Sequence, residues 1–297
     1  MTRARSTTRR EPSLMFFDEM TSPEVAEAIQ AGAPIIVGAG ATEQHGGHLP
    51  LNSDTLQGID IGKRVARQLA REGIPLVVGP TIPFGPRPFR TESPRDFPGT
   101  VNLSHATLKA VFEEVCAELI EQGFRTVYFN LTNAETDPIL QIVAKELTER
   151  TPARVITVNW LIGIRSSYRA LMRATKPQSH GGEGETARML ATAPRLVRMD
   201  RARSYHPRPS AHPPIEADAM PYLGGGIGRY RPPDGMFDDS FRGIWGDPGL
   251  ATRAQGQKVY ALITDWIVQI VRKTNPTPRR KANDFSSLAD QGSSPEA

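Results

Sequence analysis

Short apolar runs alternate with longer segments of mixed polarity over most of this chain. Four runs have the length and the flanking turn residues of strands, at residues 34–38, 76–78, 126–131 and 155–158. The first of them, which contains Ile35-Ile36-Val37, is apolar enough to be buried. These runs predict four strands between residues 34 and 158.

The segments between the runs carry the apolar spacing of helices that bury one face. In the clearest case, apolar residues recur at steps of three and one, and Gly123 follows as a terminator. That face consists of Leu108, Val111, Phe112, Val115, Cys116 and Leu119. Further helices are predicted over residues 22–30, 54–71, 139–149, 180–193 and 259–271. Strands separated by helices need right-handed crossovers, so the pattern predicts an α/β fold with a mainly parallel sheet.

The pattern weakens at both ends and in one long internal stretch. Residues 1–13 read as a basic, disordered arm and residues 273–297 as a disordered tail rich in Pro, Ser, Arg and Asp. A single α/β domain is predicted over residues 14–272. Within it, residues 205–235 hold many Pro and Gly and little periodicity, which predicts a long irregular excursion.

Composition narrows the classes of protein. The 297 residues contain one cysteine, Cys116, so an intrachain disulfide is excluded and a reducing, cytoplasmic location is expected. No apolar run reaches membrane-spanning length, so no membrane partner is expected. The net charge of +4 comes partly from the two tails, and no compact basic stripe with aromatic residues is visible. We therefore expect a soluble protein that binds no nucleic acid.

The segment that follows the first predicted strand carries the most informative chemistry. Glu43, His45, His48 and Asp54 lie within twelve residues of one Gly-interrupted stretch. Open α/β sheets place their sites on loops at the carboxyl ends of strands, and two carboxylates with two imidazoles there indicate a divalent-metal site. A structural role for His48 in shaping the loop stays open beside the metal role.

A second cluster opens the helix that ends at Ala193. His180 and Glu183 lie three residues apart across a Gly pair, so both side chains can point into one cleft. Glu185 is expected to cap or favour the helix N-terminus. Other chemistries have little support: a partial dinucleotide fingerprint begins at Gly38 but has Glu43 at its third glycine position, and no nucleophile elbow is present.

At this point the chain resembles the creatininase (creatinine amidohydrolase) family. Glu43-Gln-His-Gly-x-His-Leu-Pro-Leu-x-x-Asp54 is similar to the family signature, and His180-Gly-Gly-Glu183 is similar to its His-Ala-Gly-Glu segment. Two further blocks occur in family order, Phe97-Pro-Gly-Thr100 and Gly243-Ile-Trp-Gly-Asp-Pro248. The resemblance covers about residues 15 to 272.

The resemblance implies a three-layer α/β/α sandwich that assembles as a homohexamer, with the 205–235 excursion packed against a neighbouring subunit. It implies a hydrolase with one or two divalent ions, zinc first, with Mn²⁺ and Fe²⁺ as alternatives. Metal ligands carry over onto Glu43, His45, Asp54 and Glu183. His180 is expected to shuttle a proton or contact the substrate, and Glu183 to lie beside it in the catalytic site.

One departure from the family concerns the segment after the third predicted strand. Relatives read Asn-Gly-His there, and Thr132 takes the place of the metal-binding His. A threonine hydroxyl is a poor zinc ligand. Glu135, three residues further on, either replaces that ligand or begins the next helix. Arg87, Arg90 and Arg95, in a second departing region, suggest an anionic substrate or a solvated charged loop.

The sequence therefore predicts a metal-dependent hydrolase that cleaves a C–N bond in a small, non-peptide amide, cyclic amides included, through a metal-activated water. Two alternatives remain open. The protein can be a diverged, catalytically idle member that binds a small ligand or fills a place in an assembly. It can also catalyse another metal-dependent cleavage on the same scaffold, of a C–C bond or a lactone.

Overall fold

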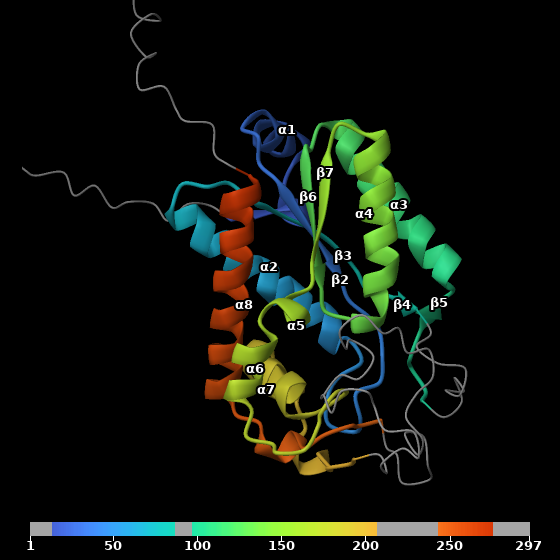
Figure 1. Cartoon of the computed structure of the whole chain (residues 1–297), viewed down its shortest axis with the longest axis vertical. Helices are drawn as coiled ribbons and strands as arrows, with labels where there is room; N and C mark the ends of the chain where they lie inside the picture. The colour runs from blue at the N-terminus through green and yellow to red at the C-terminus, as the bar shows by residue number, and fades with distance from the viewer. Residues whose placement is uncertain (1–13, 87–96, 207–242, 276–297) are drawn as a thin grey trace, which may run out of the picture.

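The computed structural model describes residues 14–86, 97–206 and 243–275 (Figure 1). Its centre is a parallel five-stranded sheet with the strand order β1-β3-β2-β6-β7. The strands are β1 Met15–Phe16, β3 Val77–Ile82, β2 Ile35–Ala39, β6 Thr126–Leu131 and β7 Arg154–Val158. A separate parallel pair joins β4 Gly85–Pro86 to β5 Asn102–Leu103.

Eight α-helices are present in the described part of the chain. They are α1 Ser22–Gln30, α2 Ser53–Arg71, α3 His105–Gln122, α4 Asp137–Arg150, α5 Trp160–Gly163, α6 Arg165–Leu171, α7 Glu183–Thr192 and α8 Arg253–Thr274. A capping box between Thr21 and Glu24, with Pro23 in the first turn, begins α1. Gly123, at a φ of +124°, ends α3 as the sequence predicts.

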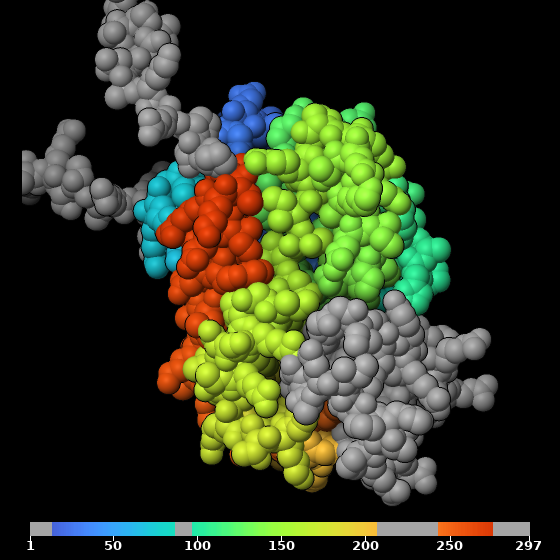
Figure 2. Space-filling view, in the orientation of Figure 1, coloured from blue at the N-terminus to red at the C-terminus, as the bar shows by residue number. Residues whose placement is uncertain are grey.

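The helices cover both faces of the sheet, as Figure 1 shows. On one face, α1, α3 and α4 pack on the strand residues Ile35 and Val37. On the other face, α2 and α8 pack on Ile36. Its side chain points away from those of Ile35 and Val37, because successive residues of a strand face opposite sides of the sheet. The space-filling view shows α8 in red at the left of the molecule and α4 in yellow-green at the upper right (Figure 2). The predicted α/β/α sandwich with a mainly parallel sheet is confirmed.

The four predicted strands and the predicted helices are all present, with small changes in their bounds. Strands β1, β4 and β5 were not predicted, because two residues are too few to show a period. The arm over 1–13, most of the tail and nearly all of the 205–235 excursion lie outside the described residues, as do Arg87, Arg90 and Arg95. None of the helices that the structure describes is long and apolar enough to cross a membrane.

Strand β2 occupies the middle of the sheet, and its end is where the candidate site is built. Ala39, the last residue of β2, pairs with Leu131, the last residue of β6. The loops that leave these two strands therefore begin side by side at one edge of the sheet. Both the Glu43–His48 segment and Asn133 follow directly from this edge.

Candidate metal centre

The loop after β2 is held by contacts with a distant part of the chain. The backbone N–H of Gln44 donates to the hydroxyl of Thr100 (2.9 Å), and Thr42 forms an antiparallel bridge with Val101. Thr100 belongs to the Phe-Pro-Gly-Thr block, so that block supports the loop. Gly46 has a φ of +69°, a left-handed conformation that lets the chain turn immediately after His45.

His45 lies at the centre of the site, with only 1% of its surface exposed. Its Nδ1 lies 3.0 Å from the carbonyl oxygen of Glu43. A carbonyl oxygen can only accept, so Nδ1 carries a proton and donates it. Nε2 is thereby directed at the carboxylates, 3.3 Å from Asp54 Oδ1 and 3.6 Å from Glu185 Oε2. An imidazole oriented by a carbonyl on one nitrogen is the usual arrangement of a metal-binding histidine.

Asp54 and Glu185 reach His45 from two different helices. Asp54 lies in the first turn of α2, at the start of the helix predicted from residue 54, and is buried. Glu185 lies in the first turn of α7 and accepts the Gly181 N–H (2.6 Å), which fits the capping role predicted for it. One ligand atom from each of His45, Asp54 and Glu185 lies within 4.8 Å of the others.

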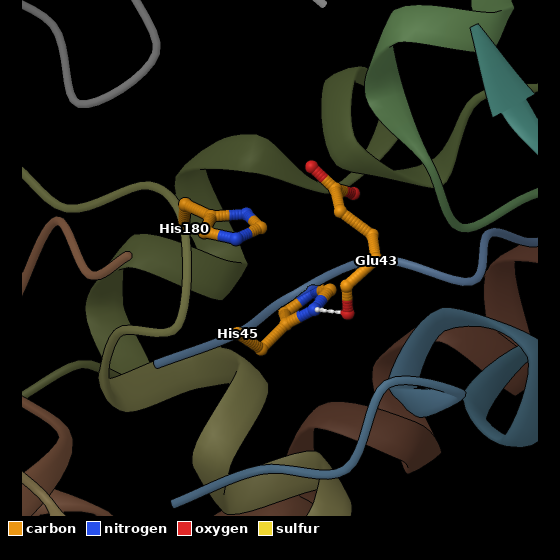
Figure 3. Close-up of side chains that lie close together, drawn as sticks. All are labelled: Glu43, His45 and His180. Atoms are coloured by element: carbon orange, nitrogen blue, oxygen red, sulfur yellow. Dashed lines mark hydrogen bonds between the residues drawn. The ribbon is translucent and has the colours of Figure 1, made fainter. Parts of the chain in front are cut away.

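A second group of neighbouring ligand atoms joins Glu43 and His180 to His45, again within 4.8 Å (Figure 3). The rings of His45 and His180 face each other at a centroid distance of 4.2 Å. His180 Nε2 lies 2.5 Å from the carbonyl oxygen of Gln44, so this nitrogen carries the proton and Nδ1 does not. Of the residues predicted for the site, the two groups bring together Glu43, His45, Asp54 and His180.

The carboxylates of the cluster favour positive charge at His45, as shown by the pKa of its imidazole. Burial alone would lower the pKa of His45, but the carboxylates of Asp54, Glu185 and Glu43 raise it to about 10. Burial opposes ionisation of Asp54, yet His45 and the Asn133 amide hold the pKa of that carboxyl below its usual range. Burial and the neighbouring His45 lower the pKa of His180 to about 4, so its imidazole is neutral at pH 7.

Thr132 does not face the cluster, contrary to the sequence interpretation of its position. Its hydroxyl donates to the carbonyl oxygen of Ala39 (2.9 Å), back toward the sheet. The next residue, Asn133, turns its side chain to the carboxylates instead, with Nδ2 at 3.0 Å from Glu43 Oε2 and 3.2 Å from Asp54 Oδ2. Sequence reasoning missed Asn133 because a one-residue offset at a strand end reverses the direction of the side chain.

Glu183 and Glu135 are not brought into either group of ligand atoms among the described residues. Glu183 is fully buried, and its carboxylate accepts hydrogen bonds from the backbone N–H groups of Arg173 and Ala174 and from the amides of Gln178 and Gln255. The structure thus does not place Glu183, a predicted ligand, beside His45; the carboxylate of this segment that faces His45 is Glu185. Glu135 lies in the short 3₁₀ helix Ala134–Thr136.

His48 has a structural position. It is completely buried, and its Nε2 lies 2.9 Å from the hydroxyl of Thr186 on α7. Burial and the neighbouring His45 lower the pKa of His48 to about 4. His48 therefore joins the loop to α7, which agrees with the loop-shaping alternative.

The Gly-Asp-Pro block supports His180 in the way that the Phe-Pro-Gly-Thr block supports His45. The N–H of Trp245 donates to the carbonyl oxygen of His180 (2.7 Å), and the N–H of Ser179 donates to the carbonyl oxygen of Trp245 (2.9 Å). Two blocks that are far apart in sequence thus fix the two histidines of the centre.

Arg188 is a buried cation beside the centre. Its guanidinium donates to Gln57 and to the Tyr168 hydroxyl (3.2 Å), lies 4.8 Å from the centre of the Trp160 ring, and approaches Glu185 Oε1 to 3.9 Å. A buried guanidinium needs a counter-charge. Glu185 therefore faces Arg188 with one oxygen and His45 with the other.

The donor set fits a divalent ion. One imidazole nitrogen and two carboxylate oxygens resemble the three protein ligands of catalytic zinc sites, which leave a further position for water or substrate. Two of the three residues, His45 and Asp54, were predicted from the sequence; Glu185 was predicted only as a helix cap.

Comparison with known proteins finds relatives that match most of the chain. The chain is 25% identical over 267 residues to the mycofactocin precursor peptide peptidase of Mycobacterium tuberculosis, covering 88% of this chain and 93% of that protein. It is 29% identical to the creatinine amidohydrolase of Pseudomonas putida, covering 68% and 80% of the two chains. A crystal structure of creatininase shares the fold, with a TM-score of 0.69 and 22% identity over 90% of this chain and all of that one.

The chain also matches the model of a whole family. Residues 18–271, nearly the whole described structure, match the creatininase family, described as creatinine amidohydrolase. Its members are metal-dependent amidohydrolases. The chain belongs to the creatininase family.

Proposed function

We propose that this protein is a divalent-metal-dependent amidohydrolase whose ion is held by His45, Asp54 and Glu185. The observation that carries the proposal is the position of His45 Nε2, which faces two carboxylate oxygens at 3.3 and 3.6 Å while Nδ1 is committed to a carbonyl. Zinc is the proposed ion. Solved creatininase structures described as a Zn-Zn type and as a Mn form make Mn²⁺ the first alternative, and Fe²⁺ follows.

The reaction proposed is hydrolysis of a C–N bond in a small linear or cyclic amide. A divalent ion bound at this centre would lower the pKa of a coordinated water and polarise the substrate carbonyl. His180 supplies the proton transfer: its neutral imidazole has an unprotonated Nδ1 and a protonated Nε2 held by Gln44. It accepts a proton from the attacking water and returns it to the leaving nitrogen.

The nature of the substrate is the finer part of the proposal. The relatives comprise a creatinine amidohydrolase and a peptide peptidase, so the scaffold accommodates both cyclic and peptide C–N bonds. Another relative, 25% identical over 66% of this chain, is the 3-dehydro-scyllo-inosose hydrolase of Thermotoga maritima. This similarity keeps cleavage of a bond other than an amide as the second candidate.

A paired substitution on α2 tests the proposal. Asp54→Asn removes a proposed ligand, whereas Asp60→Asn makes the same charge change on the same helix, where Asp60 pairs with Arg64. Metal content by mass spectrometry should fall to background in Asp54→Asn and stay at the wild-type value in Asp60→Asn. Activity on creatinine, simple lactams and short peptides should follow the metal content.

Two results would contradict the proposal in different ways. A wild-type protein without bound metal after growth with zinc would favour the catalytically idle alternative. A wild-type protein with stoichiometric metal that cleaves a lactone or a keto-inositol, and no amide, would favour the second candidate.

We also propose the homohexamer and the cytoplasmic location, with a small molecule as the only partner. The support is membership of the family and the single buried Cys116, which forms no intrachain disulfide. Light scattering at micromolar concentration tests the assembly, and a monomer would contradict it.

A further inference from the structure

The side of Asp54 that faces away from His45 is closed by an amide. Asn133 Nδ2 lies 3.0 Å from Glu43 Oε2 and 3.2 Å from Asp54 Oδ2. Ionised carboxylates can only accept hydrogen bonds, so the nitrogen, and not the oxygen, of this amide faces them. Each of its two N–H groups is available for one carboxylate.

The rest of Asn133 is fixed as firmly as its nitrogen. Its Oδ1 accepts a hydrogen bond from the Thr136 hydroxyl (3.1 Å), and its backbone N–H donates to the carbonyl oxygen of Ala39 (3.2 Å). The side chain is buried between β2 and the 3₁₀ helix that follows β6. The amide is therefore part of the folded structure around the carboxylates.

An amide nitrogen in this place takes the position of a bridging cation. An ion shared by Glu43 and Asp54 would need both oxygens at about 2.0–2.2 Å. The space between those oxygens already holds Nδ2. The two N–H dipoles stabilise the two negative charges without adding a positive one.

His45 sets a second limit on the number of ions. It belongs to both groups of neighbouring ligand atoms, but its Nδ1 proton is committed to the Glu43 carbonyl oxygen. Only Nε2 of His45 remains to bind a metal ion. The group with Glu43 and His180 and the group with Asp54 and Glu185 are therefore alternative sites for one ion.

We infer that this centre holds a single divalent ion, because Asn133 replaces a second one between Glu43 and Asp54. The inference rests on the proposed metal site at His45, Asp54 and Glu185. It makes Glu43 a residue that positions Asn133 and His45. It also separates this chain from the solved relative described as a Zn-Zn type.

Metal stoichiometry tests the inference without any substrate. The wild-type protein is titrated with Zn²⁺, and bound metal per chain is measured after gel filtration. In a parallel sample loaded with Mn²⁺, electron paramagnetic resonance distinguishes an isolated ion from an exchange-coupled pair. We expect one ion per chain and the spectrum of an isolated ion.

Substitutions at neighbouring positions complete the experiment. Asn133→Asp replaces the N–H donors with a third carboxylate, so this variant should bind a second ion and show the coupled spectrum. Thr132→Ser keeps its hydroxyl directed at Ala39 and should stay at one ion, as a matched control for the segment. Circular dichroism establishes that each variant is folded.

The outcomes separate this inference from the proposed function. Two ions in the wild-type protein, or a coupled Mn²⁺ pair, would overturn the single-ion inference and leave the hydrolase proposal standing. No bound ion in the wild-type protein would overturn the proposed function itself. One ion in the wild-type protein and still one in a folded Asn133→Asp variant would show that Asn133 is not what excludes the second.

Discussion

Glu183 and Glu185 lie two residues apart at the beginning of α7, but their carboxylates have opposite surroundings. Glu183 is enclosed by four residues that donate N–H groups from the backbone or from amides. Glu185 faces His45 on one side and Arg188 on the other. The first joins the segment before α7 to the body of the domain, and the second completes the proposed metal centre.

The difference follows from the helical period. Two residues on an α-helix are separated by about 200° around the axis, so one side of α7 cannot present both carboxylates to the same site. A motif written as letters does not show which of two glutamates points where. The surroundings of each carboxylate decide its role.

The largest expected effect comes from exchanging the two carboxylates for amides one at a time. Glu185→Gln should weaken metal binding by at least about 10- to 100-fold, the loss usual even for a residue that only orients a ligand. Glu183→Gln should keep the metal but lower the free energy of unfolding by about 3 kcal/mol, because charge-assisted hydrogen bonds are lost. Calorimetric zinc titration and urea unfolding measure the two effects, and the reverse pattern would exchange the roles.

The counter-charge of Glu185 gives the next largest effect. Arg188→Met removes the buried guanidinium and leaves the Glu185 carboxylate without that cation, so the metal-free protein should lose about 2 to 3 kcal/mol of stability. A bound divalent ion compensates Glu185, and the loss should be smaller in the zinc-loaded protein. An equal loss in both states would show that Arg188 acts through its contacts with Gln57, Tyr168 and Trp160 and not as the counter-charge of Glu185.

The smallest effect expected concerns the protonation of His45 in the metal-free protein. Burial lowers its pKa, but Asp54, Glu185 and Glu43 raise it to about 10, whereas the carboxylate of Glu183 lies outside this cluster. Because the folded pKa is above the unfolded value of about 6.5, this stabilisation is complete below pH 6.5 and is lost as the pH rises through 10. An NMR titration should show a lower pKa in Glu185→Gln and the wild-type value in Glu183→Gln.

His48 and His180 have the opposite sign and provide an internal reference. Their pKa values of about 4 lie below the unfolded value, so the unfolded chain binds more protons between pH 6.5 and 4. Acidification over that range should therefore destabilise the metal-free protein, and the midpoint of thermal unfolding should fall. A midpoint that rises between pH 6.5 and 4.5 would contradict these assignments.

The regular elements of the fold could be predicted from the sequence because they repeat a period. The α3 face from Leu108 to Leu119 and the β6 run over 126–131 are examples, and both are present as predicted. The loop with Glu43, His45 and Asp54 was also found, because its residue types are unusual at that density. These signals are local, so one sequence contains them.

The rest of the centre depends on direction, which residue letters do not record. Thr132 and Asn133 are neighbours at the end of β6, and only the backbone course after Leu131 decides which side chain meets the carboxylates. Glu183 and Glu185 pose the same problem on a helix. In each pair, the residue at the position that binds metal in relatives, Thr132 or Glu183, forms structural hydrogen bonds. The other residue, Asn133 or Glu185, faces the site.

The most direct test of the central claim is the position of the ion in a crystal of the zinc-loaded protein. An anomalous difference map at the zinc edge locates it without reference to any substrate. We predict one peak at about 2.0–2.2 Å from His45 Nε2 and from carboxylate oxygens of Asp54 and Glu185. A peak bound by Glu183, or one between Glu43 and Asp54 in place of the Asn133 amide, would contradict the account.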